Sequence, residues 1–183
     1  HMGHFYFIRH GETVWNAINK ICGATDIELT DKGHKQAEEA GRYILNENIQ
    51  ADEILYSPLI RASETARHIS EITGISGRKE ERLKEQHFGK WEGAPRDSED
   101  FKKAKEDFVT DYEGGESMMH VAQRVYNLLD EIKAESDKKT YILVAHNGIA
   151  RVIESYFKNM TNEEYASYGV KNCQITRFDF DRC

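Results

Sequence analysis

The chain has only 2 prolines and 3 cysteines among its 183 residues. Because prolines are scarce and no stretch is rich in glycine or serine, no linker is marked, and we expect a single domain over residues 1–183. The cysteines are widely spaced and form no C-x-x-C pair, so neither a disulfide framework nor a zinc knuckle is indicated. We therefore expect Cys22, Cys173 and Cys183 to be free thiols.

Long apolar runs and an excess of positive charge are also missing. The longest uninterrupted apolar runs, Phe5 to Ile8 and Ile142 to Ala145, are far shorter than the roughly 20 residues of a membrane helix. No targeting leader opens the chain, and His1-Met2 is interpreted as a cloning remnant, so we expect a cytoplasmic protein. A formal net charge of -7 disfavours nucleic acid and acidic membranes as partners, and an anionic ligand would need cations focused at one place. A monomer and a homodimer both remain open.

Strand and helix patterns alternate along the chain. Buried-strand or edge-strand patterns cover four segments: His4–Ile8, Glu53–Tyr56, Thr140–Ala145 and Gln174–Phe180. Helical spacing of apolar residues follows Thr30-Asp31, Ser57-Pro58 and Ser117, and helices are also expected at Phe101–Phe108 and Ile149–Phe157. This order predicts an α/β fold of three layers, a mostly parallel sheet between helices with one antiparallel edge strand.

Cationic and imidazole side chains stand where the predicted strands end. Arg9 and His10 follow the first strand, Arg61 follows the second, and His146 follows the strand at Thr140–Ala145. Ligands of open α/β sheets bind beyond the carboxyl ends of the strands, so we expect these residues to meet. Guanidinium groups bind phosphate oxygens, and a neutral imidazole is a nucleophile, which together indicate phosphoryl transfer to nitrogen. His34, His68, His87 and His120 are expected to be ordinary turn or surface residues.

Five sequence blocks carry a family resemblance. Arg9-His10-Gly11-Glu12-Thr13 with Asn16 resembles the signature of the histidine phosphatase superfamily, also called the phosphoglycerate mutase-like family. The other blocks follow in the family's order and are Ser57–Ala62, Leu83–Gly93, Gly114–Ser117 and Val144–Gly148. The resemblance therefore covers nearly the whole chain and implies the family's three-layer α/β/α sandwich.

The resemblance also implies roles. It makes His10 the nucleophile and Glu85 the general acid and base, with Arg9, Arg61, Asn16 and His146 around the phosphate. Residues 94–113 would form a lid-like segment, and the chemistry would need neither a metal nor a cofactor.

Two positions depart from the family pattern in the substrate-binding region. Cys22 before Gly23 replaces a polar residue, and Asn147 stands where glycine is common. We expect Cys22, Gly23 and Asn147 to contact the substrate, and both departures bear on which alcohol is accepted.

The short chain and the segment Phe88–Gly93 resemble the phosphatase branch, which predicts a phosphatase acting on small phosphorylated metabolites. A cofactor-dependent phosphoglycerate mutase is the alternative, and specificity like that of alpha-ribazole phosphatase, which Gly23–Asp26 resembles, or of fructose-2,6-bisphosphatase is a further one. Two other classes stay open: a phospho-ligand binding module without turnover, and a metallohydrolase that uses His10, Glu12 and His146 as ligands.

Overall fold

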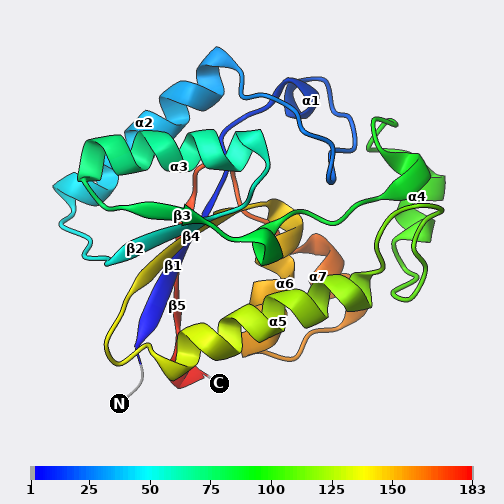
Figure 1. The fold of residues 1–183 in the computed structure, drawn as a ribbon. Coiled ribbons are helices and arrows are strands. Elements are labelled where there is room, and N and C mark those ends of the chain that lie inside the picture. The colour runs from blue at the N-terminus through cyan, green and yellow to red at the C-terminus, as the bar shows by residue number, and fades with distance from the viewer. Residues whose placement is uncertain (1–2, 183) are drawn as a thin grey trace.

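A five-stranded sheet forms the centre of the fold (Figure 1). The structure, a computed structural model, describes residues 3–182, so His1-Met2 and Cys183 lie outside the described residues. The strands are β1 (His4–Arg9), β2 (Glu53–Tyr56), β3 (Gly77–Lys79), β4 (Tyr141–Ala145) and β5 (Ile175–Asp179). They lie in the order β3-β2-β4-β1-β5. All neighbours pair in parallel except β5, which is antiparallel to β1 at one edge, and the predicted sheet is confirmed.

Helices cover both faces of this sheet (Figure 1). The α-helices are α1 (Val14–Ala17), α2 (Asp31–Asn46), α3 (Ile60–Thr73), α4 (Glu99–Ala104), α5 (Met118–Ala134), α6 (Asn147–Phe157) and α7 (Asn162–Ser167). Three single 3-10 turns are η1 (Glu81–Leu83), η2 (Gly89–Trp91) and η3 (Phe180–Arg182). α2 and α3 pack on one face, and α5 and α6 on the other, which confirms the three-layer sandwich. None of the helices in the described part of the chain is long and apolar enough to cross a membrane.

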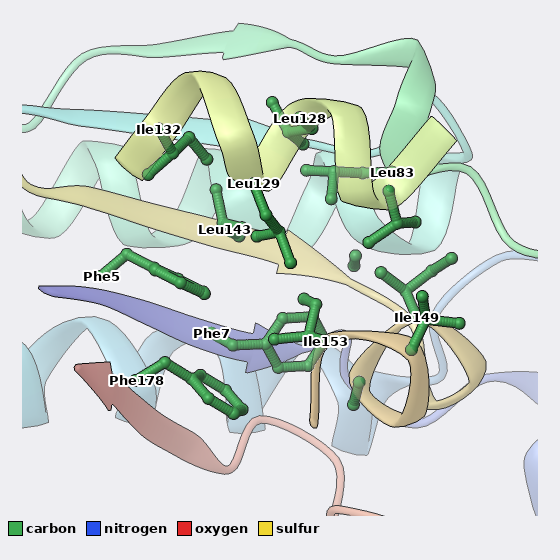
Figure 2. Close-up of a cluster of buried hydrophobic side chains, with 14 of the residues drawn as sticks. Phe5, Phe7, Leu83, Leu128, Leu129, Ile132, Leu143, Ile149, Ile153 and Phe178 are labelled. Atoms are coloured by element: carbon green, nitrogen blue, oxygen red, sulfur yellow. The ribbon is translucent and has the colours of Figure 1, made fainter. Parts of the chain in front are cut away.

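The pleat of the strands divides the core in two. Along β1, Phe5 and Phe7 face α5 and α6, whereas Ile8 joins the cluster under α2 and α3, as the two-residue period of a strand requires. Figure 2 shows the larger cluster, in which Phe178 of β5 stacks on Phe5 with the ring centroids 5.3 Å apart. Every residue of β4 is buried, because this central strand has helices on both faces.

Side-chain caps fix where several helices begin. Thr30 accepts a hydrogen bond from Gly33 N at the start of α2, and Ser117 accepts one from His120 N at the start of α5, as both predicted boundaries required. The predicted helix at Phe101–Phe108 is instead α4, which begins at Glu99 because Ser98 caps it. α6 likewise begins two residues earlier than expected, at Asn147.

A third, smaller cluster lies away from the sheet, beside α4. Ile21, Phe88, Phe101 and Tyr112 are buried in it. An antiparallel bridge between Lys20 and Pro95 ties the segment before α4 to the loop after α1. Figure 1 shows α1 and α4 at the same side of the molecule. The predicted lid-like segment therefore packs on its own apolar cluster.

Candidate functional site

His10 lies at the end of β1 with one ring nitrogen already engaged. Its backbone N–H continues the ladder to Ala145, and its Nδ1 lies 2.6 Å from the Gly11 carbonyl. A carbonyl can only accept, so Nδ1 carries the proton and Nε2 keeps a free lone pair. Burial first, and then the charges of Arg61 and Arg9, hold the pKa of His10 well below its usual value. His10 is therefore a neutral imidazole whose Nε2 is unprotonated.

Two guanidinium groups interact with His10, and the Nε of each has no hydrogen-bond partner. Arg61, 1% exposed in the first turn of α3, donates to the carbonyls of Thr25 at 2.6 Å and Gly23 at 2.5 Å. Arg9 donates to the Val170 carbonyl at 2.8 Å. In both arginines Nε is buried and has no partner. Burial, followed by the charge of Arg96, lowers the pKa of Arg9 to about 10, which leaves it protonated at neutral pH.

His146 is the second imidazole and caps α6. Its ring centroid lies 5.2 Å from that of His10. Its Nε2 is 2.7 Å from the hydroxyl of Ser57, which follows β2, and its buried Nδ1 has no partner. Burial, with Arg61 and His10 next, holds the pKa of His146 well below its usual value. When the Ser57 hydroxyl donates to Nε2, the ring proton stays on Nδ1 as a third unused donor.

The carboxylate of Glu85 lies at the N-terminus of α6. It accepts hydrogen bonds from the backbone N–H groups of Gly148 at 3.0 Å and Gln86 at 2.9 Å. A Cβ on Gly148 would lie 2.5 Å from Glu85 Oε1, so glycine is what allows this close approach. Glu85 is only 6% exposed, and its carboxylate is fixed at the rim of the site.

One pocket opens at His10, and most of the predicted site residues line it. Arg9, His10, Asn16, Cys22, Glu85 and Asn147 contribute to its lining. Arg61 and His146 are not part of this lining and are each only 1% exposed, but both interact electrostatically with His10. Gly23 contributes through the carbonyl that holds Arg61.

Three of the predicted substrate contacts are partly engaged within the protein. Asn16 closes a capping box with Thr13, which occupies its side-chain oxygen and leaves the amide NH2 as a donor. Asn147 Oδ1 accepts from Val170 N at 2.8 Å. The Cys22 thiol contacts the Thr25 carbonyl, and burial raises its pKa, so it is a thiol rather than a thiolate.

The sequence reasoning missed three cations that line the pocket. Arg96 precedes α4, Lys105 follows it, and Arg151 lies on α6. A signal existed for Arg151, because it follows Asn147 by four residues on a helix and therefore shares its face. Lys105 likewise follows Phe101 by four residues. No local pattern identified Arg96.

The ligand set of the metallohydrolase alternative is not assembled. Glu12 accepts a hydrogen bond from Thr30 at 3.0 Å and lies 3.8 Å from Lys32. Among the described residues no group of three or more His, Cys, Asp or Glu side chains could hold a metal ion.

Comparison with known proteins identifies the family of this chain. Residues 5–183 match the model of the histidine phosphatase superfamily (branch 1). A probable phosphoglycerate mutase of Erwinia tasmaniensis is 32% identical over 95% of this chain and 83% of its own length. The structure of a mycobacterial glucosyl-3-phosphoglycerate phosphatase has a TM-score of 0.83 and 29% identity, covering 97% of this chain and 90% of its own.

A second solved structure is similar over a comparable length. The phosphoserine phosphatase of Entamoeba histolytica, in complex with 3-phosphoglyceric acid, has a TM-score of 0.82 and 31% identity, covering 98% of this chain and 92% of that one. The family model matches nearly the whole chain, and the fold and the sequence motifs described above agree with it. The chain belongs to the histidine phosphatase superfamily, branch 1.

Proposed function

We propose that this protein is a phosphatase that hydrolyses phosphate monoesters of small metabolites through a phosphohistidine on His10. The observation that supports this most is the set of unused donors around His10. Arg9 Nε, Arg61 Nε and His146 Nδ1 are all buried without a partner, and a buried unpaired donor costs about 1–3 kcal/mol. A phosphoryl group on His10 would present oxygens to these donors. Two similar solved structures are of proteins named as phosphatases, which also supports the proposal.

In the first half of the reaction, His10 Nε2 attacks phosphorus. The P–N bond forms as the ester P–O bond breaks, and the departing alkoxide takes a proton from Glu85. Arg9, Arg61 and His146 stabilise the charge that spreads over the equatorial oxygens. The neutral state of His10, which follows from its lowered pKa, means that no proton has to leave Nε2 before the attack.

In the second half, a water molecule attacks the same phosphorus. Glu85, now a carboxylate, takes the proton of that water, the P–N bond breaks, and inorganic phosphate leaves. The protonated acid and the free imidazole are regenerated together. Glu85 serves both halves because it is fixed at the rim by Gly148 and Gln86.

A metabolite panel tests the proposal. Purified protein should release phosphate from p-nitrophenyl phosphate and from some phosphorylated metabolites, and phosphopeptides belong in the panel. His10→Ala should abolish the release, whereas His120→Ala, which alters an exposed residue of α5, should leave it unchanged. Rapid quenching of wild type should trap protein-bound phosphate that is labile to acid and stable to alkali. Turnover that survives in His10→Ala, or trapped phosphate that is stable to acid, would overturn the mechanism.

A phosphoglycerate mutase is the second candidate, because one relative with 32% identity carries that name. A mutase keeps water from its phosphohistidine until the product alcohol has reoriented, whereas a phosphatase admits it. Incubation with 3-phosphoglycerate and a trace of 2,3-bisphosphoglycerate separates the two. Rapid formation of 2-phosphoglycerate without free phosphate would favour the mutase.

The same proposal places the activity in a single domain that acts in the cytoplasm as a monomer or homodimer. The net charge of -7 argues for a small metabolite over nucleic acid or a membrane surface.

A further inference from the structure

Residues 168–173, the connecting segment, lie between α7 and β5 and are hydrogen-bonded to the end of β1. The backbone N–H of Cys173 donates to the Arg9 carbonyl at 2.8 Å. The side-chain amide of Asn172 donates to the His10 carbonyl at 3.0 Å. The backbone that carries the first arginine and the first histidine of the site is therefore fastened to the connecting segment.

Val170 lies in the middle of the connecting segment and is hydrogen-bonded on both sides. Its carbonyl accepts from Arg9 Nη1 at 2.8 Å, and its N–H donates to Asn147 Oδ1 at 2.8 Å. Its side chain is buried in the core cluster that includes residues of α5 and α6. Both polar groups of the Val170 backbone and its side chain are engaged, which fixes the direction of the carbonyl that Arg9 contacts.

The Val170 carbonyl in turn orients the Arg9 guanidinium. A guanidinium is a rigid planar fork, so holding Nη1 constrains where its other nitrogens point. One of these, the buried Nε of Arg9, has no partner. The carbonyl is neutral, so unlike a carboxylate it orients the guanidinium without cancelling its positive charge. Arg9 therefore keeps both a fixed direction and a full charge for an anion.

Asn147 is the residue that holds Val170 from the side of α6. It is the first residue of that helix, and it lines the same pocket as Arg9. Without Asn147 Oδ1, the Val170 N–H would lose its acceptor and would have to turn toward water or another oxygen. The carbonyl of the same residue would then move with it. Gly169 packs beside this amide, because a Cβ there would lie 3.2 Å from Asn147 Nδ2 and 3.3 Å from Oδ1.

We propose that Asn147 is a positioning residue for phosphoryl transfer, which acts through Val170 on Arg9. Asn147 Oδ1 holds the Val170 N–H, and the Val170 carbonyl holds Arg9 Nη1, which directs Arg9 Nε toward the phosphate. This rests on the proposed function in taking Arg9 as a phosphate ligand. The sequence suggested that Asn147 bears on which alcohol is accepted, whereas this arrangement gives it an effect on the phosphate that is the same for every alcohol.

Inorganic phosphate and vanadate test the proposal without turnover and without an alcohol. In calorimetry on the whole protein, Asn147→Ala should weaken the binding of both by about tenfold, because one charged donor is no longer fixed. It should lower kcat/KM by about 10- to 100-fold, and by the same factor for p-nitrophenyl phosphate and for alkyl phosphates. The matched control is Asn162→Ala, which alters the exposed first residue of α7 and should change neither quantity.

A double-mutant cycle separates positioning from a direct contact of Asn147 with the substrate. In an Arg9→Met background, Asn147→Ala should change kcat/KM and vanadate affinity by less than about threefold, since the group on which Asn147 acts is gone. Gly169→Ala keeps every hydrogen-bonding group but crowds the Asn147 amide by a few tenths of an ångström. It should lower kcat/KM by about threefold in the wild-type background and have no effect beside Arg9→Met. Urea midpoints show that each variant is folded, and Gly169→Ala carries the test where Asn147→Ala is not.

Three results would overturn the positioning role. The first is a loss in Asn147→Ala that depends on the alcohol while phosphate affinity stays the same. The second is an equal loss with and without Arg9→Met, and the third is a lowered urea midpoint with unchanged phosphate affinity and kcat/KM. A protein with the expected losses of phosphate binding that hydrolyses no ester would refute the proposed phosphatase and leave the positioning role standing. Turnover that depends on His10, combined with additive losses in the cycle, would do the reverse.

Discussion

Gly148→Ala should separate catalysis from stability in this protein. The new Cβ would lie 2.5 Å from Glu85 Oε1, where 3.4 Å is the lower bound of an ordinary contact. The carboxylate is the end of a flexible side chain, so it moves by about 1 Å and loses its bond to Gly148 N, which is 3.0 Å long. A displacement of that size costs catalysis about 100-fold, or about 2.7 kcal/mol of barrier. Alanine meanwhile favours the helix by up to about 1 kcal/mol over glycine.

The assay compares substrates that differ in their need for an acid. For an alkyl phosphate, kcat/KM should fall about 100-fold, whereas for p-nitrophenyl phosphate, whose leaving group needs little protonation, it should fall much less. The urea midpoint should stay the same or rise. In a double-mutant cycle, Gly148→Ala added to Glu85→Gln should cost little more, since both act on one carboxylate. An alkyl phosphatase activity of Gly148→Ala within about threefold of wild type, or additive losses in the cycle, would refute the role given to Glu85.

The remaining predictions concern the arginine, the loop around it and the histidines. Arg61→Ala should raise the activation barrier by about 2.7–4 kcal/mol and lower kcat/KM accordingly. Arg61→Lys should not restore activity, because an ammonium group cannot bond both carbonyls and still offer a third donor in a fixed direction. Steady-state kinetics measure both variants. Glu92→Ala should cost at least about 2 kcal/mol of unfolding free energy, because the Glu92 carboxylate accepts from three backbone N–H groups and a threonine hydroxyl; an unchanged urea midpoint would contradict this. The unliganded protein should lose stability as the pH falls below about 6.5, because the unfolded state of His10 and His146 takes up protons there while the folded rings, with lowered pKa values, do not. His10→Asn should reduce that slope in urea titrations at pH 7.5 and pH 5.5, and a slope equal to wild type would count against the buried neutral ring.

Where local chemistry marks an element, the sequence predicted it closely. β2 has the expected bounds, Glu53–Tyr56, because an apolar run is stopped by Ser57-Pro58. β3 was missed because its three residues are all exposed, so that only backbone bonds to β2 define it and no side-chain pattern reveals it. α7 was also missed, although Thr161 and Glu164 close a capping box there, and that Thr-x-x-Glu pattern is readable from sequence.

The residues of the site also fall into those that the sequence predicts and those that only tertiary packing brings there. Arg9, His10 and His146 were predictable together because parallel strands bring their carboxyl ends to one edge. Arg96 and Lys105 reach the pocket because residues 94–113 pack on the cluster around Phe101 and Phe88. That packing depends on residues far apart in the chain, so the spacing of residues along the sequence does not show where Arg96 and Lys105 will lie. The chemistry of transfer is therefore visible in the motifs, whereas the recognition of the alcohol depends on tertiary structure.

The buried charges and unpaired donors of the site lower the stability of the folded protein, and a bound anion should offset this loss. A buried Arg61 held by neutral carbonyls, two neutral histidines and three unpaired donors are each less stable than their hydrated equivalents. A tetrahedral oxyanion removes several of these penalties at once, because its oxygens accept from the donors and its charge matches the guanidinium groups. Binding of phosphate or vanadate should consequently raise the unfolding temperature by linkage. Under the proposed mechanism these contacts should tighten further as phosphorus becomes five-coordinate, because only interactions that are stronger in the transition state than with the substrate accelerate a reaction.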